Sequence, residues 1–220
     1  MDPSSLTLPG AVALGAWLVA APILGIALAR TRWRDASGGP AARVWPAALA
    51  ALVVLWTLRG HAAPPFAFHL YGIAALTLLT GPSLALVGGA AVVACTFALG
   101  GTPWANAAAT WLVAVAAPVA VIVAVLRAVE RMLPANFFVY VFAVAFFGAG
   151  LSYVAAGAAG LALMVACSDV TASLAFGEYL LLVITLAFGE AILSGMALTL
   201  AAVYRPAWVA TFDASRYFAR

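Results

Sequence analysis

The sequence predicts an all-α polytopic membrane protein with seven transmembrane helices. Hydrophobic residues make up 67% of the 220 residues and charged residues only 8%, whereas soluble domains carry about 45–50% apolar and about 25% charged residues. Several apolar runs reach the ~20 residues that a helix needs to cross ~30 Å of hydrocarbon. The ~10-residue alternating segments of a transmembrane barrel do not occur. This composition excludes a soluble enzyme, a soluble binding module and a disordered chain.

The first three predicted helices end at charged residues or at glycine and proline. The first stops at the Arg30–Asp35 cluster, the second at Arg59-Gly60, and the third lies between Pro64-Pro65 and Gly81-Pro82. Arginines mark the membrane surface, and proline and glycine interrupt helices. We therefore expect helices over Pro9–Ala29, Trp45–Leu58 and Phe66–Thr80.

The last four predicted helices are longer. The fourth ends at Gly100-Gly101, the fifth contains Pro118 and closes at Arg127 to Arg131, and the seventh stops at Arg205-Pro206. Pro118 predicts a kink. We expect these helices over Ser83–Leu99, Trp104–Val129, Asn136–Cys167 and Phe176–Tyr204. Residues 1–205 then form one membrane domain, and residues 206–220 form an aromatic and charged tail.

The placement of arginine predicts the orientation. All ten basic residues are arginines, and seven alternating spans put every one except Arg59 on the same side. Because cytoplasmic loops collect Lys and Arg, we expect the N-terminus outside and the C-terminus and tail in the cytoplasm. The location expected is the inner membrane of a bacterium. The basic excess is thus a topology signal, and no nucleic-acid partner is predicted.

Both histidines then lie near the outer face. His61 and His69 are accompanied there by acidic residues and a thiol, namely Asp2, Asp169, Glu178 and Cys167. Imidazoles in such surroundings suit a borderline transition metal such as Ni, Co, Cu or Zn. Two structural alternatives stay open: His69 is an interfacial histidine bonded to a backbone carbonyl, and His61 is a solvated loop residue.

Glu190 is predicted to lie near the middle of the bilayer. It follows Glu178 by twelve residues, which corresponds to about 18 Å of helix. Its functional interpretation is a gate, a proton relay or a support for a metal ligand. Its structural interpretation is a hydrogen bond to neighbouring backbone or to Asn106. Asn106 itself either bonds across helices or orients a ligand.

Other motifs indicate packing and exclude common enzyme chemistry. Small residues recur every fourth position along the sixth segment, at Gly148, Ser152, Ala156 and Gly160, which is typical of a close helix-packing face. Neither a P-loop nor an HExxH or GxSxG motif is present in the sequence. We therefore expect that the chain is not an enzyme and does not bind ATP itself.

Four short motifs resemble one family. The run Phe68-His69-Leu70-Tyr71-Gly72 is followed by Gly81-Pro82, then by Gly100-Gly101 upstream of Asn106, and finally by Phe188-Gly189-Glu190-Ala191. In this order they resemble the CbiM/NikM-type substrate-capture components of energy-coupling-factor ABC transporters for cobalt and nickel. The resemblance covers residues 66 to 200, while the tail is more similar to a divergent branch of predicted permeases.

The resemblance implies a seven-helix protein with an extracytoplasmic N-terminus and a metal near the outer face. In the family the N-terminal amine, an imidazole at position two and the histidine matching His69 supply nitrogen ligands. His69 carries over, but the chain begins Met1-Asp2-Pro3, and Pro3 has no backbone N–H. We expect His61 as the second ligand and an oxygen from Asp2, which leaves the metal open.

The predicted function is therefore uptake of a divalent transition-metal ion as substrate. A separate coupling membrane subunit and ATP-binding cassette subunits are the predicted partners, together with the lipid bilayer. Two alternatives remain at this point. One is a membrane chaperone or assembly factor that delivers metal to another protein, and the other is a proton-linked carrier of a small solute that uses Glu190.

Overall fold

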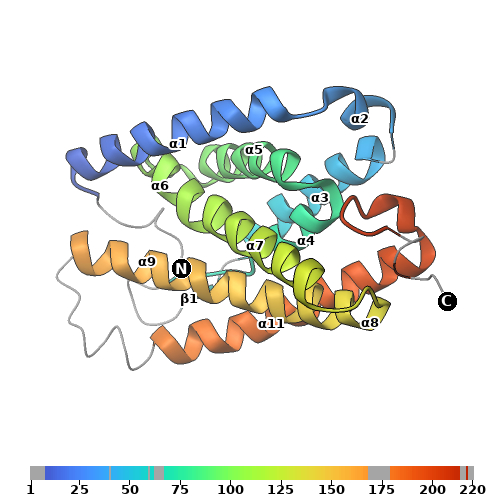
Figure 1. Ribbon diagram of the computed structural model, residues 1–220. Coiled ribbons are helices and arrows are strands. Elements are labelled where there is room, and N and C mark those ends of the chain that lie inside the picture. Colours follow the sequence, from blue (N-terminus) through green and yellow to red (C-terminus); the bar gives the residue numbers. More distant parts are fainter. Residues whose placement is uncertain are drawn as a thin grey trace.

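Long apolar helices form the bundle in the computed structural model, which describes residues 8–39, 41–58, 60–61, 67–167, 179–213 and 217. Within these residues, five helical stretches are long and apolar enough to cross a membrane. They are α1 (Gly10–Arg30), α5 (Pro82–Gly100), the run of η2 (Trp104–Asn106), α6 (Ala107–Trp111), η3 (Leu112–Ala116) and α7 (Ala117–Met132), the run of α8 (Phe137–Val139), η4 (Tyr140–Gly148) and α9 (Ala149–Cys167), and α11 (Leu180–Tyr204). The chain is therefore a multi-pass membrane protein built almost entirely of helices (Figure 1).

Shorter elements lie between or after these helices along the chain. They are α2 (Trp33–Gly38), α3 (Ala41–Thr57), α4 (Ile73–Thr80), the strands β1 (Gly60–His61) and β2 (Ala67–Phe68), and η6 (Pro206–Trp208). The two strands pair antiparallel, with Gly60 opposite Phe68 and His61 opposite Ala67. This small ladder joins the end of α3 to the segment that leads into α4.

The prediction of one helix over Phe66–Thr80 is wrong in its first half. Helix α4 begins only at Ile73, and its eight residues are about 12 Å long, far short of the ~30 Å of hydrocarbon. Residues 69–72 carry no regular secondary structure, so His69 precedes the helix instead of lying in it. Gly72, the N-cap of α4, has a positive φ of 63° that an α-helix does not contain.

Pro118 and the small-residue stripe of the sixth segment both affect the local geometry or packing of their helices. The π-helix Leu112–Ala116 directly precedes Pro118, which lies in the first turn of α7. A proline ring crowds the carbonyl four residues earlier, here that of Ala114, and a widened π turn accommodates it. The small-residue stripe of the sixth segment is buried as predicted, and Gly148 faces Ile122 and Val125 of α7.

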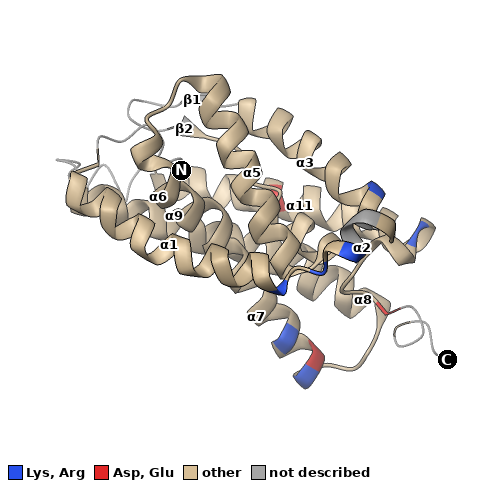
Figure 2. Cartoon of the chain, turned by 90° about the horizontal axis from the view of Figure 1, so that it is seen from above, with Lys and Arg blue, Asp and Glu red and all other residues tan. Residues whose placement is uncertain are grey.

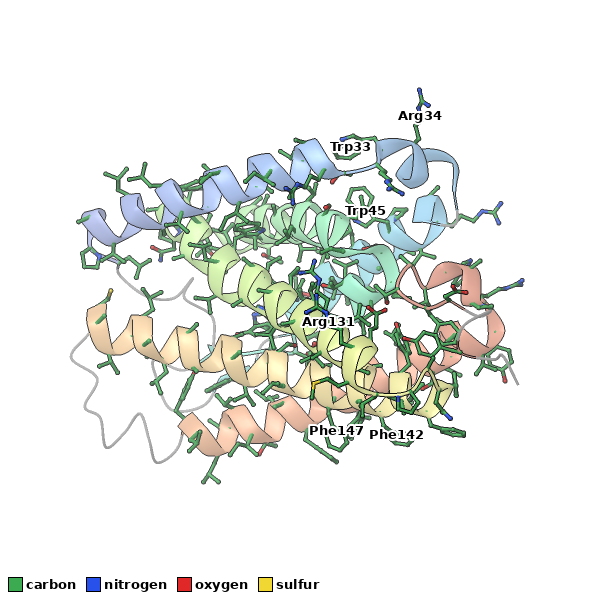
Figure 3. All side chains as sticks on the ribbon, in the orientation of Figure 1. Trp33, Arg34, Trp45, Arg131, Phe142 and Phe147 are labelled. Carbon is green, nitrogen blue, oxygen red and sulfur yellow. The ribbon has the colours of Figure 1, made fainter. Side chains whose placement is uncertain are left out.

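The described arginines gather at one end of the bundle (Figure 2). They lie at the end of α1, at the start of α3, near the end of α7 and after α11, at positions Arg30, Arg32, Arg34, Arg43, Arg127, Arg131 and Arg205. Trp45 near the same end donates its indole N–H to the Leu84 carbonyl at 3.1 Å (Figure 3). We refer to this end as the arginine end.

The tail after α11 also packs at the arginine end. Ala210 and Thr211 donate their backbone N–H groups to the carbonyls of Leu79 and Leu78, at 3.0 and 3.3 Å. Because the last carbonyls of a helix lack partners within the helix, these bonds close the C-terminus of α4. Tyr140 reinforces the contact through a 2.7 Å hydrogen bond between its hydroxyl and that of Thr211.

Candidate metal site

The site is built around residues 69–72, a non-helical segment inside the bundle. Non-helical backbone in a membrane protein is tolerated only where protein groups or water satisfy its N–H and C=O groups, because lipid cannot. Helices α3, α9 and α11 supply those groups here. His69, Tyr71 and Gly72 are all buried, so the segment is held from several sides.

Aromatic side chains satisfy two of its carbonyls. The Tyr153 hydroxyl of α9 donates to the His69 carbonyl at 3.0 Å. The Trp56 indole N–H of α3 donates to the Tyr71 carbonyl at 2.9 Å. The Tyr153 ring also stacks on the ring of Tyr71, with the two centroids 4.7 Å apart. The side chains of Trp56 and Tyr153 thus combine apolar burial with one hydrogen bond each, which is why such residues suit this position.

Glu190 of α11 satisfies the N–H groups of the same segment. Its two carboxyl oxygens accept from Tyr71 N at 2.9 Å and from Gly72 N at 2.7 Å. The side chain is 1% exposed. Helix α4 starts one residue later and its N-cap offers no side-chain bond of its own, so Glu190 caps it from another helix. The structural interpretation of Glu190 is thereby confirmed, with neighbouring backbone as the partner.

His69 has a defined tautomer. Its Nδ1 lies 3.1 Å from the Leu70 carbonyl oxygen, which can only accept, so Nδ1 carries the proton. In a neutral imidazole the lone pair then resides on Nε2. Metal-binding histidines characteristically donate their other ring N–H to such a carbonyl. The backbone-bonded interpretation is therefore confirmed for one ring nitrogen, and it leaves the other chemically suited to a cation.

The His69 ring is enclosed by aromatic neighbours. It is 3% exposed, and its centroid lies 4.7 Å from that of Trp56 and 5.1 Å from that of Tyr71. Such packing fixes the direction of the ring, and the apolar walls exclude bulk water. A cation bound at Nε2 would be held in a low-dielectric setting where its interactions are strong.

The other predicted metal ligands differ in where they lie relative to His69. The backbone of His61 lies opposite Ala67, two residues before His69. Cys167 ends α9, fourteen residues after Tyr153, or about 21 Å along the helix, so Cys167 is not brought to His69. Asp2, Asp169 and Glu178 lie outside the described residues. Within the part of the chain that the structure describes, no three His, Cys, Asp or Glu side chains gather around one point.

Asn106 is buried where η2 passes into α6, at 3% exposure. Thr110 lies one turn later, and its hydroxyl has no hydrogen-bond partner among the described residues. The sequence alone does not identify Trp56, Tyr71 and Tyr153 as site residues. Their signal was available, since each is an aromatic residue with a polar atom inside an apolar segment.

Gly72 supports the first testable prediction. Its φ is +63°, and an added Cβ would overlap a methyl group of Leu52. Gly72→Ala should destabilise the protein by about 2–5 kcal/mol, because left-handed backbone costs about 1–2 kcal/mol and overpacking about 1–3 kcal/mol. The measurement is the thermal unfolding temperature of the purified protein in detergent. Gly101→Ala is the control, since Gly101 has a φ of +62° with open space around it; equal losses would contradict the overlap.

The fold and this site together define a multi-pass membrane protein with a buried imidazole inside its bundle. The family model for the cobalt uptake substrate-specific transmembrane region, CbiM, matches residues 5–208. The chain belongs to this family. It is therefore a membrane component of transition-metal uptake and not an enzyme. A comparison with curated proteins gives no match.

Proposed function

We propose that this chain captures a divalent transition-metal ion, its substrate, at Nε2 of His69. The observation that carries the proposal is the 3.1 Å bond from His69 Nδ1 to the Leu70 carbonyl, which leaves the Nε2 lone pair for a cation. Family membership supports a cobalt- or nickel-type substrate. His61 is proposed as the second ligand, because the strand ladder puts its backbone beside the residues that precede His69.

The proposed topology has seven crossings although five helices are long. Helix α3, with 17 residues, is about 25 Å long. Residues 67–72, if extended, add roughly 20 Å to the ~12 Å of α4. Seven alternating crossings put the described arginines on one side, which we assign to the cytoplasm of a bacterial inner membrane. The N-terminus and the metal site then face outside, where Asp2 is a candidate oxygen ligand.

The proposed energy source is external to this chain. The sequence holds no P-loop motif for nucleotide binding, so import requires ATP-binding cassette subunits and a membrane subunit that couples them. The described part of the tail, which packs on α4 at the arginine end, is proposed to lie in the cytoplasm, where such subunits would meet it. The family assignment favours uptake over delivery to a metalloenzyme, and capture of the coupling subunits with the tagged chain tests this.

Metal analysis tests the proposed site directly. The purified chain is incubated with Co²⁺ or Ni²⁺, desalted and measured for metal per protein. Loss of a partner behind a metal ligand costs 10–100-fold in affinity, so we expect His69→Ala, which removes a ligand, to lose more than about 100-fold. Ser194→Ala, which changes a buried hydroxyl without a hydrogen-bond partner among the described residues, should bind as wild type. Equal metal content in wild type and His69→Ala would reject the site.

A further inference from the structure

Two adjoining depressions at the arginine end have complementary chemistry. The first, which we call the basic hollow, has a volume of about 520 Å³ and is lined by Arg43, Arg205 and Trp208 among others. The second, the apolar groove, has a volume of about 480 Å³ and runs between α3 and α11, where Val44, Ala47 and Ala201 line it. Arg43, Tyr204, Arg205 and Trp208 line both depressions, so the charged space opens directly into the apolar one.

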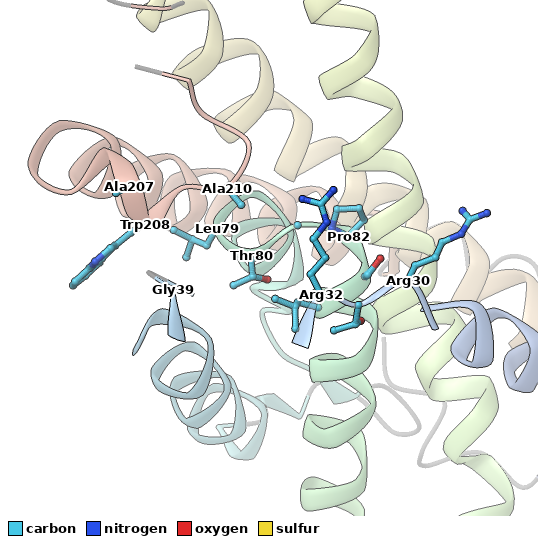
Figure 4. A pocket seen from close by; sticks show the side chains of 13 residues that line it. Arg30, Arg32, Gly39, Leu79, Thr80, Pro82, Ala207, Trp208 and Ala210 are labelled. Atoms are coloured by element: carbon cyan, nitrogen blue, oxygen red, sulfur yellow. The ribbon is translucent and has the colours of Figure 1, made fainter. Parts of the chain in front are cut away.

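The arginines of the basic hollow are available to an anion. Arg43 and Arg205 are exposed, and neither forms an ion pair or side-chain hydrogen bond with any residue that the structure describes. A neighbouring hollow of about 440 Å³ shares Gly39, Ala207 and Trp208, and Arg32 lies over it (Figure 4). Unpaired guanidinium groups at the end of membrane helices attract phosphate groups, which they bind with two parallel hydrogen bonds.

The apolar groove distinguishes between the classes of anion that the basic hollow could bind. A free phosphate or an acidic peptide uses the charged hollow and gains nothing from the apolar groove. A phospholipid uses both, because its headgroup phosphate meets the arginines and an acyl chain lies along α3 and α11. The exposed rings of Tyr204 and Trp208, 73% and 41% accessible, lie where aromatic residues meet lipid headgroups. We propose that this combined site binds one anionic phospholipid, with phosphatidylglycerol as the simplest example of its class.

Native mass spectrometry of the full chain in detergent tests the proposal. The probes are phosphatidylglycerol and the zwitterionic phosphatidylcholine with identical acyl chains. One Arg near a headgroup contributes about fivefold in affinity, so the double variant Arg43→Gln, Arg205→Gln should lower the preference for phosphatidylglycerol by roughly 25-fold. Arg127→Gln, Arg131→Gln is the matched control, since it removes two exposed arginines of the same end that line neither depression. Equal preference in both double variants would overturn the proposal.

A second variant separates lipid from other anions. Ala47 is exposed in the groove, so Ala47→Phe should block the acyl chain and reduce binding of phosphatidylglycerol with all arginines intact. Ala50→Phe, one turn further along the same exposed face of α3 but not among the residues that line the groove, should bind as wild type. Unchanged binding by Ala47→Phe would overturn the lipid assignment. So would displacement of the lipid by excess inorganic phosphate or by a polyglutamate peptide, which would identify a free-anion or acidic-peptide site.

Discussion

Glu190→Ala is expected to destabilise the protein by about 2–6 kcal/mol, because each buried N–H group left without an acceptor costs about 1–3 kcal/mol. Two such groups, those of Tyr71 and Gly72, depend on its carboxyl oxygens. For a chain of this size the loss corresponds to a decrease of unfolding temperature on the order of 10 °C. Thermal unfolding in detergent measures it. Glu190→Gln should lose about half as much, since its amide keeps one acceptor oxygen and turns an NH₂ group toward the second N–H.

Ser194→Ala is the control for Glu190. Ser194 follows one turn later on α11, is fully buried, and its hydroxyl has no hydrogen-bond partner among the described residues. Removing that hydroxyl should change the unfolding temperature little. The same variants are also compared with wild type in metal affinity. We expect Glu190→Ala to lower it, because residues 69–72 are released and the His69 ring is no longer held. A Glu190→Ala protein that unfolds near the wild-type temperature, or that keeps wild-type affinity, would contradict the role of Glu190 as the cap of α4.

The long helices were predictable because hydropathy reports the one property they share. The segment from Phe66 to Thr80 is just as apolar, yet only its second half is helical. Hydropathy does not reveal where backbone hydrogen bonds go, and the acceptors for Tyr71 and Gly72 come from Glu190, more than a hundred residues later. The sequence predicts how far along its helix Glu190 lies but could not identify its partner, since no local spacing links the two segments.

His69 illustrates the same limit within the site. Its apolar surroundings in the sequence indicate that the ring needs a partner or a ligand. The structure shows the partner, because Nδ1 lies 3.1 Å from the carbonyl oxygen of the next residue, and the ligand role stays a prediction. That bond lies in the non-helical segment 69–72, whose backbone groups are held by Glu190, Trp56 and Tyr153. A tautomer is thus set by tertiary contacts, which a single sequence does not display.

Helix α4 is capped at both ends by distant segments. Glu190 accepts from the N–H groups of Tyr71 and Gly72, which directly precede the helix, and the tail residues Ala210 and Thr211 donate to the carbonyls of Leu79 and Leu78. A helix of eight residues is too short to be stable by itself, so its position is imposed by these contacts. Residues 69–72 and the tail at the arginine end are therefore joined through one short helix.

Trp56 provides a test that separates the metal site from general stability. Its indole is 1% exposed, packs on the His69 ring and donates to the Tyr71 carbonyl at 2.9 Å. Trp56→Ala should cost about 3–5 kcal/mol through the cavity alone, and the milder Trp56→Phe about 1–3 kcal/mol through the unpaired carbonyl. Trp45→Phe removes a similar bond to a carbonyl, that of Leu84, away from His69. If Trp56 orients the His69 imidazole, the Co²⁺ affinity measured by equilibrium titration falls about 10–100-fold in Trp56→Phe. The Co²⁺ affinity of Trp45→Phe stays unchanged. An equal change in both variants would show that Trp56 only stabilises the fold.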